Sequence, residues 1–156
     1  MIDETATIQS RIQTDIATAM KAKEADTLST LRMLKAALLE AKTKKARDET
    51  LSAEEEIEVL QRYVKKRRET LEEMKKLGRE DLAQREHAEI EVTKRYLPQP
   101  VSEDEVRRLV RDAVQSTGAA GPKDMGKVMG VVLAQVKGRA EGSVVSRLVK
   151  EALAGN

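Results

Sequence analysis

The sequence contains no cysteine, no tryptophan and no phenylalanine, and its only aromatic side chains are two tyrosines. Without cysteine the chain can form no disulfide, no thiolate nucleophile and no cysteine-based metal site. Only three prolines interrupt the 156 residues, which leaves room for long helices. No apolar run approaches the roughly 20 residues that a membrane-spanning helix needs. We therefore expect no membrane partner.

The residues that are present are mainly aliphatic and charged. Hydrophobic residues make up 40% of the chain and charged residues 36%, with a net charge of only +2. Such a composition is typical of long packed helices. Asp3 and Glu4 stand where a secretory signal peptide would carry positive charge. We expect a cytoplasmic protein.

Apolar residues recur at helical spacing through residues 1–97 and predict four helices. The first carries Ile8, Ile12 and Ile16 on one face. The first helix is expected to start at Thr5 or Thr7, and the second at Asp26 or Thr27 after a connection at 21–26. The third is expected to start at a capping box formed by Ser52 and Glu55, and the fourth at about Glu80. Gly78 is expected to end the third helix, and the fourth to run to Leu97.

Pro98 and Pro100 mark the expected domain boundary, because proline cannot continue the fourth helix. Three further helices are predicted in residues 98–156. The first of these is expected to start at a capping box formed by Ser102 and Glu105 and to end at Gly118. The second is expected from Met125 to Val136, and the third to follow a turn over 138–142 and to be capped by Ser143. The predicted fold is all-α: a bundle of about four helices (1–97) followed by a small three-helix tail domain (98–156).

Positive charge is concentrated in the tail. Residues 123–150 hold two acidic side chains and six basic ones: Lys123, Lys127, Lys137, Arg139, Arg147 and Lys150. By contrast, we interpret the basic run 65–68 as mainly structural, since Glu69, Glu72 and Glu73 follow it at helix-pairing distance.

Gly126, Gly130 and Ala134 repeat every four residues, so one face of their helix is almost bare. Glycine costs a helix about 1 kcal/mol relative to alanine, which indicates that something approaches closely. Two interpretations remain open: packing of another helix within the domain, or approach by a partner's backbone. The following turn, 137–143, adds cations and free helix amides that suit phosphate.

No catalytic constellation is recognisable in the sequence. Residues 121–127 match the first part of a phosphate-binding loop. Val128, however, occupies the position where Ser or Thr must hold magnesium, and no predicted strand precedes the loop. His87 and Glu91 lie one helical turn apart, but two ligands do not make a metal site. We predict no catalytic residue, no metal and no cofactor.

Several strings of the sequence resemble the YqeY family. They are Leu31-Arg-Met-Leu-Lys-Ala36, Arg67-Arg68-Glu69, Gly78-Arg79-Glu-Asp-Leu82, Tyr96-Leu-Pro98, Asp124-Met-Gly-Lys-Val-Met-Gly130 and Lys137-Gly-Arg-Ala-Glu-Gly142. The tail of this family is similar to that of GatB, the tRNA-contacting subunit of an amidotransferase. The resemblance implies RNA contacts at Gly126, Lys127, Gly130, Lys137, Gly138 and Arg139. The catalytic cradle of GatB has no counterpart here.

The leading hypothesis is a non-catalytic protein that binds the backbone of folded tRNA through the basic, glycine-rich tail, with Lys123, Arg147 and Lys150 as further candidate contacts. It would assist tRNA-dependent amidation or aminoacylation, with a protein partner in that process. A second hypothesis is a protein-interaction adaptor that docks a partner on the Gly126/Gly130 face. A third is an accessory to carbon–nitrogen ligase activity with glutamine as amide donor, by analogy alone.

Overall fold

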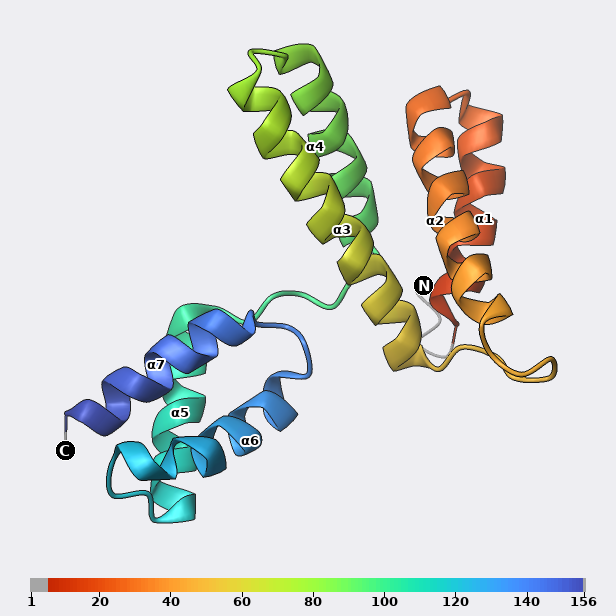
Figure 1. Ribbon diagram of the computed structural model, residues 1–156. Helices are drawn as coiled ribbons and strands as arrows, with labels where there is room; N and C mark the ends of the chain where they lie inside the picture. The colour runs from red at the N-terminus through yellow and green to blue at the C-terminus, as the bar shows by residue number, and fades with distance from the viewer. Residues whose placement is uncertain (1–5, 156) are drawn as a thin grey trace. The chain divides into compact units, whose positions relative to one another are not determined.

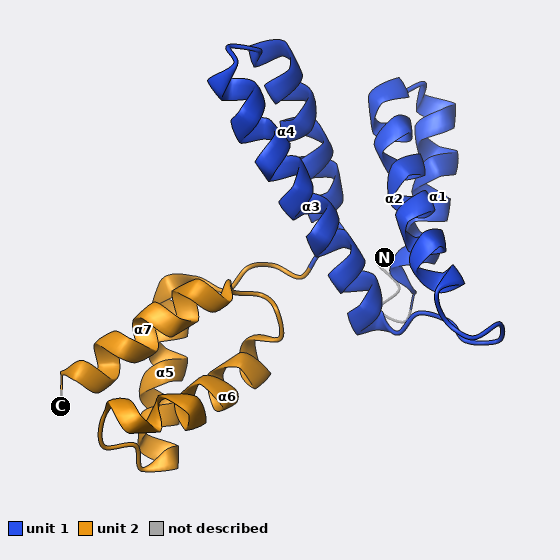
Figure 2. Cartoon of the chain, viewed as in Figure 1, with its two compact units in different colours: residues 1–97 blue, residues 98–156 orange. Residues whose placement is uncertain are grey.

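The computed structural model describes residues 6–155, and within this range the chain forms seven α-helices, one short 3-10 helix and no β-strand (Figure 1). The predicted all-α class is confirmed. Asp3, Glu4 and Thr5 lie outside the described residues. The chain divides into two compact units, residues 1–97 and 98–156 (Figure 2). None of the described helices combines the length and the hydropathy that crossing a bilayer requires.

The first unit is built from two antiparallel helical hairpins. Helix α1 (Ile8–Ala22) packs on α2 (Ala25–Thr43), and α3 (Ala53–Lys76) packs on α4 (Glu80–Lys94). Helix α2 also lies against both α3 and α4, which joins the two hairpins. The shared core consists almost entirely of aliphatic side chains: Ile8, Ile12, Ile16, Ala19, Leu31, Leu34, Leu38, Val59, Leu60 and Val92, with Tyr96.

Several predicted helix ends in this unit are confirmed. The Thr7 hydroxyl accepts the amide of Ser10 and caps α1. Ser52 and Glu55 form the reciprocal capping box of α3, and Gly78 closes that helix in a left-handed conformation, with φ of +70°. Each pairing satisfies backbone groups that a helix end leaves open.

The connection between α1 and α2 was predicted too long. Helix α2 begins at Ala25, directly after Glu24, so the prediction of a cap at Asp26 or Thr27 is wrong. The reason is that Lys23 adopts a left-handed conformation (φ 56°), which turns the chain within two residues. Helix α4 is also shorter than predicted and ends at Lys94.

Two polar contacts tie α1 to the second hairpin. The buried Glu56 carboxylate accepts the backbone amide of Gln9 at 2.8 Å, which places negative charge at the first turn of α1. The buried Tyr96 hydroxyl donates to Asp15 on α1. Burial and this carboxylate raise the pKa of Tyr96. The core and these contacts fix the end of the first unit just before Pro98.

The second unit has a core made mainly of valine. It contains α5 (Glu103–Thr117), the 3-10 helix η1 (Pro122–Asp124), α6 (Met125–Val136) and α7 (Gly142–Ala154), and all three α-helices pack on one another. The buried side chains are Val106, Val110, Ala113, Val128, Val132, Val136, Val145, Leu148, Val149 and Leu153.

Two predicted caps of the second unit need correction. The Ser102 hydroxyl accepts the Glu105 amide, but the Glu105 carboxylate pairs with Arg108 at 2.8 Å. Only the Ser102 half of that predicted capping box is therefore present. Ser143 does not cap α7, because the helix starts one residue earlier and Glu141 occupies the capping position. Gly118 ends α5 in a left-handed conformation, as predicted.

Candidate nucleic-acid interface

Helix α6 presents one apolar and one bare side. Val128, Val132 and Val136 recur at four-residue spacing and are completely buried. Gly126 and Gly130 point away from this core and are exposed. The valines thus orient the helix so that its glycine side faces solvent within the tail unit.

The space above the two glycines is open. Apart from the neighbouring backbone of α6 itself, a Cβ atom added at Gly126 or at Gly130 would meet no atom of the tail unit within 4 Å. Packing of a helix within the tail domain therefore does not account for these glycines, and that interpretation is wrong. The approach of a partner to this open side stays a prediction.

The basic turn after α6 has a backbone fixed by hydrogen bonds. Lys137 and Gly138 both adopt left-handed conformations, with φ of 45° and 78°. The Arg139 amide donates to the Val136 carbonyl at 2.9 Å, and the Arg139 carbonyl accepts the Val101 amide at 2.8 Å. The side chains of Lys137 and Arg139 are exposed, so a rigid turn carries two cations into solvent.

Two more cations lie at the start of α6. Lys123 on η1 and Lys127 on α6 are exposed and flank Asp124. The Asp124 carboxylate accepts the Ala120 amide at 2.9 Å. That bond, and then the charges of the two lysines, lower the pKa of this carboxyl. Asp124 is therefore held by the backbone of the loop before η1, where it offsets part of the lysines' charge.

The side chains of Lys123, Lys127, Lys137 and Arg139 form no ion pair with another residue of the described range. They lie at the two ends of the glycine side of α6. Lys127 and Lys137 are ten residues apart, which corresponds to about 15 Å along a helix. We call Gly126, Lys127, Gly130, Leu133, Ala134 and Lys137 the α6 face.

The two candidates on α7 differ from this group. Arg147 pairs with Glu103 of α5 at 2.5 Å and with Glu151 of its own helix at 3.3 Å, so its charge already has two acidic partners. Lys150 is exposed and forms no ion pair in the described part of the chain. The structure thus groups the cations of η1, α6 and the basic turn, and sets Arg147 apart.

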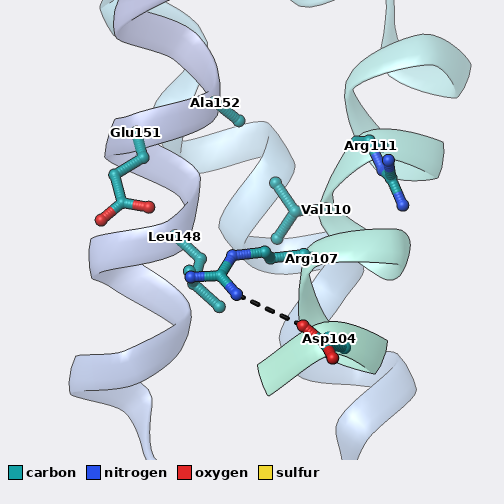
Figure 3. Close-up of a pocket in the computed structure, with 7 residues that line it drawn as sticks. All are labelled: Asp104, Arg107, Val110, Arg111, Leu148, Glu151 and Ala152. Atoms are coloured by element: carbon teal, nitrogen blue, oxygen red, sulfur yellow. Dashed lines mark hydrogen bonds and ion pairs between the residues drawn. The ribbon is translucent and has the colours of Figure 1, made fainter. Parts of the chain in front are cut away.

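A groove between α5 and α7 was not predicted from the sequence. Figure 3 shows Val110 and Leu148 between the two helices and Arg107 directed at Asp104, 3.4 Å away. Arg111 lies along the same groove and has no ion-pair partner among the described residues. The groove is of mixed charge, since Asp104 and Glu151 line it beside the two arginines and Arg107 pairs with Glu103 and Asp104. The four-residue spacing of Arg107 and Arg111 could have indicated that both arginines lie on one side of α5.

The remaining motifs give no catalytic arrangement in the described residues. No group of three or more His, Asp or Glu side chains within residues 6–155 is placed to hold a metal ion. The stretch that resembles a phosphate-binding loop forms the short helix η1 and runs directly into α6. His87 lies on α4 and is exposed.

Comparison with known proteins gives a match across both units. The model of the YqeY family, described as Yqey-like protein, matches residues 9–153. One relative is named altered inheritance of mitochondria protein 41, mitochondrial, from Pyrenophora tritici-repentis (strain Pt-1C-BFP). It is 32% identical over 147 residues, which cover 90% of this chain and 78% of the relative.

Proposed function

The chain belongs to the YqeY family, and on that premise we propose that its tail unit binds the sugar–phosphate backbone of folded tRNA without catalysing a reaction. The proposed partners are tRNA and a protein of tRNA-dependent amidation or aminoacylation. The cytoplasmic location of this protein stays a prediction. The relative from Pyrenophora tritici-repentis is named as a mitochondrial protein.

The observation that carries the proposal is the α6 face. Exposed glycines let a partner's backbone come close to the helix, and unpaired lysines flank them. Polyanion binding depends on such cations, because each neutralised phosphate releases condensed counterions. Lys137 and Arg139 add charge on a turn whose backbone is already ordered, so little conformational entropy opposes binding.

The mode of binding follows from the side chains available. Residues 98–156 contain no aromatic side chain, and single-stranded nucleic acids are usually held by stacking bases on aromatic rings. A tail without aromatic side chains is better suited to contact the phosphates and riboses of a folded RNA and to recognise its shape. Arg147 is not among the primary contacts, since Glu103 and Glu151 already neutralise it.

Binding of purified full-length protein to tRNA, measured at low and moderate salt, tests the proposal. The Lys137→Glu/Arg139→Glu variant should lose most of the affinity while its circular dichroism spectrum stays helical. A Lys75→Glu/Lys76→Glu variant is the matched control, because it makes the same charge change on exposed residues of α3. No binding by the parent at low salt, or equal loss in both variants, would refute the tail as the RNA site.

A protein-interaction role is the second candidate, and one observation favours it. Leu133 lies on the α6 face and is 41% exposed. An exposed apolar side chain one helical turn beyond Gly130 suits a partner helix as well as a ribose. Binding of a protein to this face should be weakened by Leu133→Asp and nearly indifferent to salt, whereas RNA binding should fall steeply with salt.

A further inference from the structure

One cluster between α3 and α4 contains every buried side-chain nitrogen or oxygen in the described chain that has no hydrogen-bond partner. The atoms that meet no distance-and-angle criterion for a hydrogen bond are the Tyr63 hydroxyl, Arg67 Nε, Glu86 Oε2 and Glu89 Oε2. The Tyr63 hydroxyl nevertheless lies close enough to the Glu89 carboxyl to interact with it. Buried polar groups are nearly always paired, because an unpaired one loses its hydration without compensation. The cluster therefore gathers the incompletely paired polar groups of the described chain at one place.

The cluster has one cation for two carboxylates. Arg67 Nη1 lies 3.5 Å from Glu86 Oε2 and 3.8 Å from Glu89 Oε2, beyond good hydrogen-bond length. The Arg67 guanidinium also lies over the Tyr63 ring, 5.2 Å from its centre. The three charged side chains are only 16–28% exposed. With both glutamates ionised, the site would carry a net charge of −1 while largely out of water.

The groups that act on the Glu89 carboxyl are Glu86, Arg67 and the Tyr63 hydroxyl. Helix α4 packs on α3 and α2. The α3 groups that face the carboxylates are Arg67 and the Tyr63 hydroxyl. The buried residues of α2 are Thr30, Leu31, Leu34 and Leu38, none of which titrates. His87, next to Glu86 in the sequence, is exposed to solvent.

We propose that Glu89, which lies beside the Glu86 carboxylate and shares Arg67 with it, holds a proton in the folded protein at pH values where exposed glutamates are ionised, and that this proton is a pH-sensitive clamp between α3 and α4. The proton comes from solvent and binds to a carboxylate oxygen. That oxygen then donates a hydrogen bond to a neighbouring acceptor of the cluster, and Arg67 is left to pair with a single charge.

The electrostatics of the site agree with this geometry. Burial, and then the charge of Glu86, raise the pKa of Glu89, with Arg67 acting in the opposite direction. Burial and the Glu89 carboxylate raise the pKa of Tyr63 to about 12, so its hydroxyl keeps its proton at neutral pH. Because the folded protein binds the glutamate proton more tightly than the unfolded chain, this contact is strongest at acidic pH and weakens as pH rises through the folded pKa.

Carboxyl carbon-13 NMR of the full-length protein tests whether Glu89 holds this proton. The Glu86→Gln and Glu89→Gln variants assign the two signals. Glu91, exposed on the same helix with Lys94 3.4 Å away, is the reference and is assigned with Glu91→Gln. The expected result is a Glu89 titration step at higher pH in the parent than in Glu86→Gln, which removes the neighbouring negative charge. An unchanged Glu89 titration in Glu86→Gln would overturn the proposal.

Hydrogen exchange tests the clamp. Protection of α3 and α4 amides, corrected for the intrinsic pH dependence of exchange, should increase in the parent as pH is lowered. It should stay constant in Glu89→Gln, which cannot bind the proton, and should not change in α5–α7 of either protein. The same pH dependence in parent and Glu89→Gln would contradict a proton-dependent contact.

Discussion

Substituting Gly130 on α6 should have opposite effects on the stability of the protein and on its binding of tRNA. In Gly130→Ala the new Cβ meets nothing within 4 Å apart from the neighbouring backbone of α6 itself, so the helix should gain up to about 1 kcal/mol. The same methyl group should weaken tRNA binding, because it separates the helix from the RNA backbone. Denaturant unfolding and a binding titration measure the two effects.

Ala134→Gly is the reverse control for Gly130→Ala. It lies on the same exposed side of α6, removes bulk and should lower stability by about 1 kcal/mol without weakening binding. Unchanged tRNA affinity in Gly130→Ala would show that close approach is not why glycine stands there.

Tyr63 makes a prediction for alkaline pH. The pKa of its hydroxyl is raised to about 12 in the folded protein, whereas in the unfolded chain it lies near 10. The folded state therefore holds this proton between about pH 10 and pH 12 while the unfolded state releases it, so stability should fall as pH rises through that range. Tyr63→Phe should make this loss of stability with pH smaller. Urea unfolding midpoints at several pH values measure the loss in both proteins, and an identical loss would contradict the raised pKa of Tyr63.

Helix caps give a prediction at the scale of elements. Ser52 accepts the Glu55 amide and begins α3, so Ser52→Ala should cost about 1 kcal/mol. Ser143 stands inside α7 and caps nothing, so Ser143→Ala should change stability by less than about 0.5 kcal/mol. Thermal or urea unfolding measures both effects. A loss of about 1 kcal/mol in Ser143→Ala would support the predicted start of α7 over the observed one.

Most helices could be predicted from the sequence because their signals are local. Four-residue spacing of isoleucine, leucine and valine identifies a buried side, and Ser52 with Glu55 or Gly118 marks an end within one turn. The start of α2 was missed because it depends on the left-handed conformation of Lys23, which lysine adopts at a cost and composition does not indicate.

The α3–α4 cluster could not be predicted for a different reason. Arg67 and Glu86 are far apart in the sequence, and their contact depends on the register of the hairpin. The basic run was interpreted as pairing with the glutamates that follow it on the same helix. Arg67 instead pairs with Glu86 and Glu89 across the α3–α4 interface, a contact that only tertiary packing determines.

For the whole molecule, the sequence could indicate two units and the basic tail but not the geometry of the α6 face. That Gly126 and Gly130 have open space beside them depends on how the three tail helices pack. Arg147 shows the same limit, since its pairing with Glu103 joins α7 to a helix more than forty residues earlier. Charge counts alone do not separate it from Lys137.

The salt dependence of tRNA binding tests the central claim most directly. Affinity of the full-length parent and of Lys137→Ala/Arg139→Ala is measured across a series of salt concentrations. If the two cations contact phosphates, the parent's log–log slope should be steep, and the variant's should be shallower by up to about 2, since each phosphate contact contributes about 0.7–0.9. Parallel slopes for the two proteins, or parent binding that is indifferent to salt, would contradict the claim that the basic tail holds the RNA backbone.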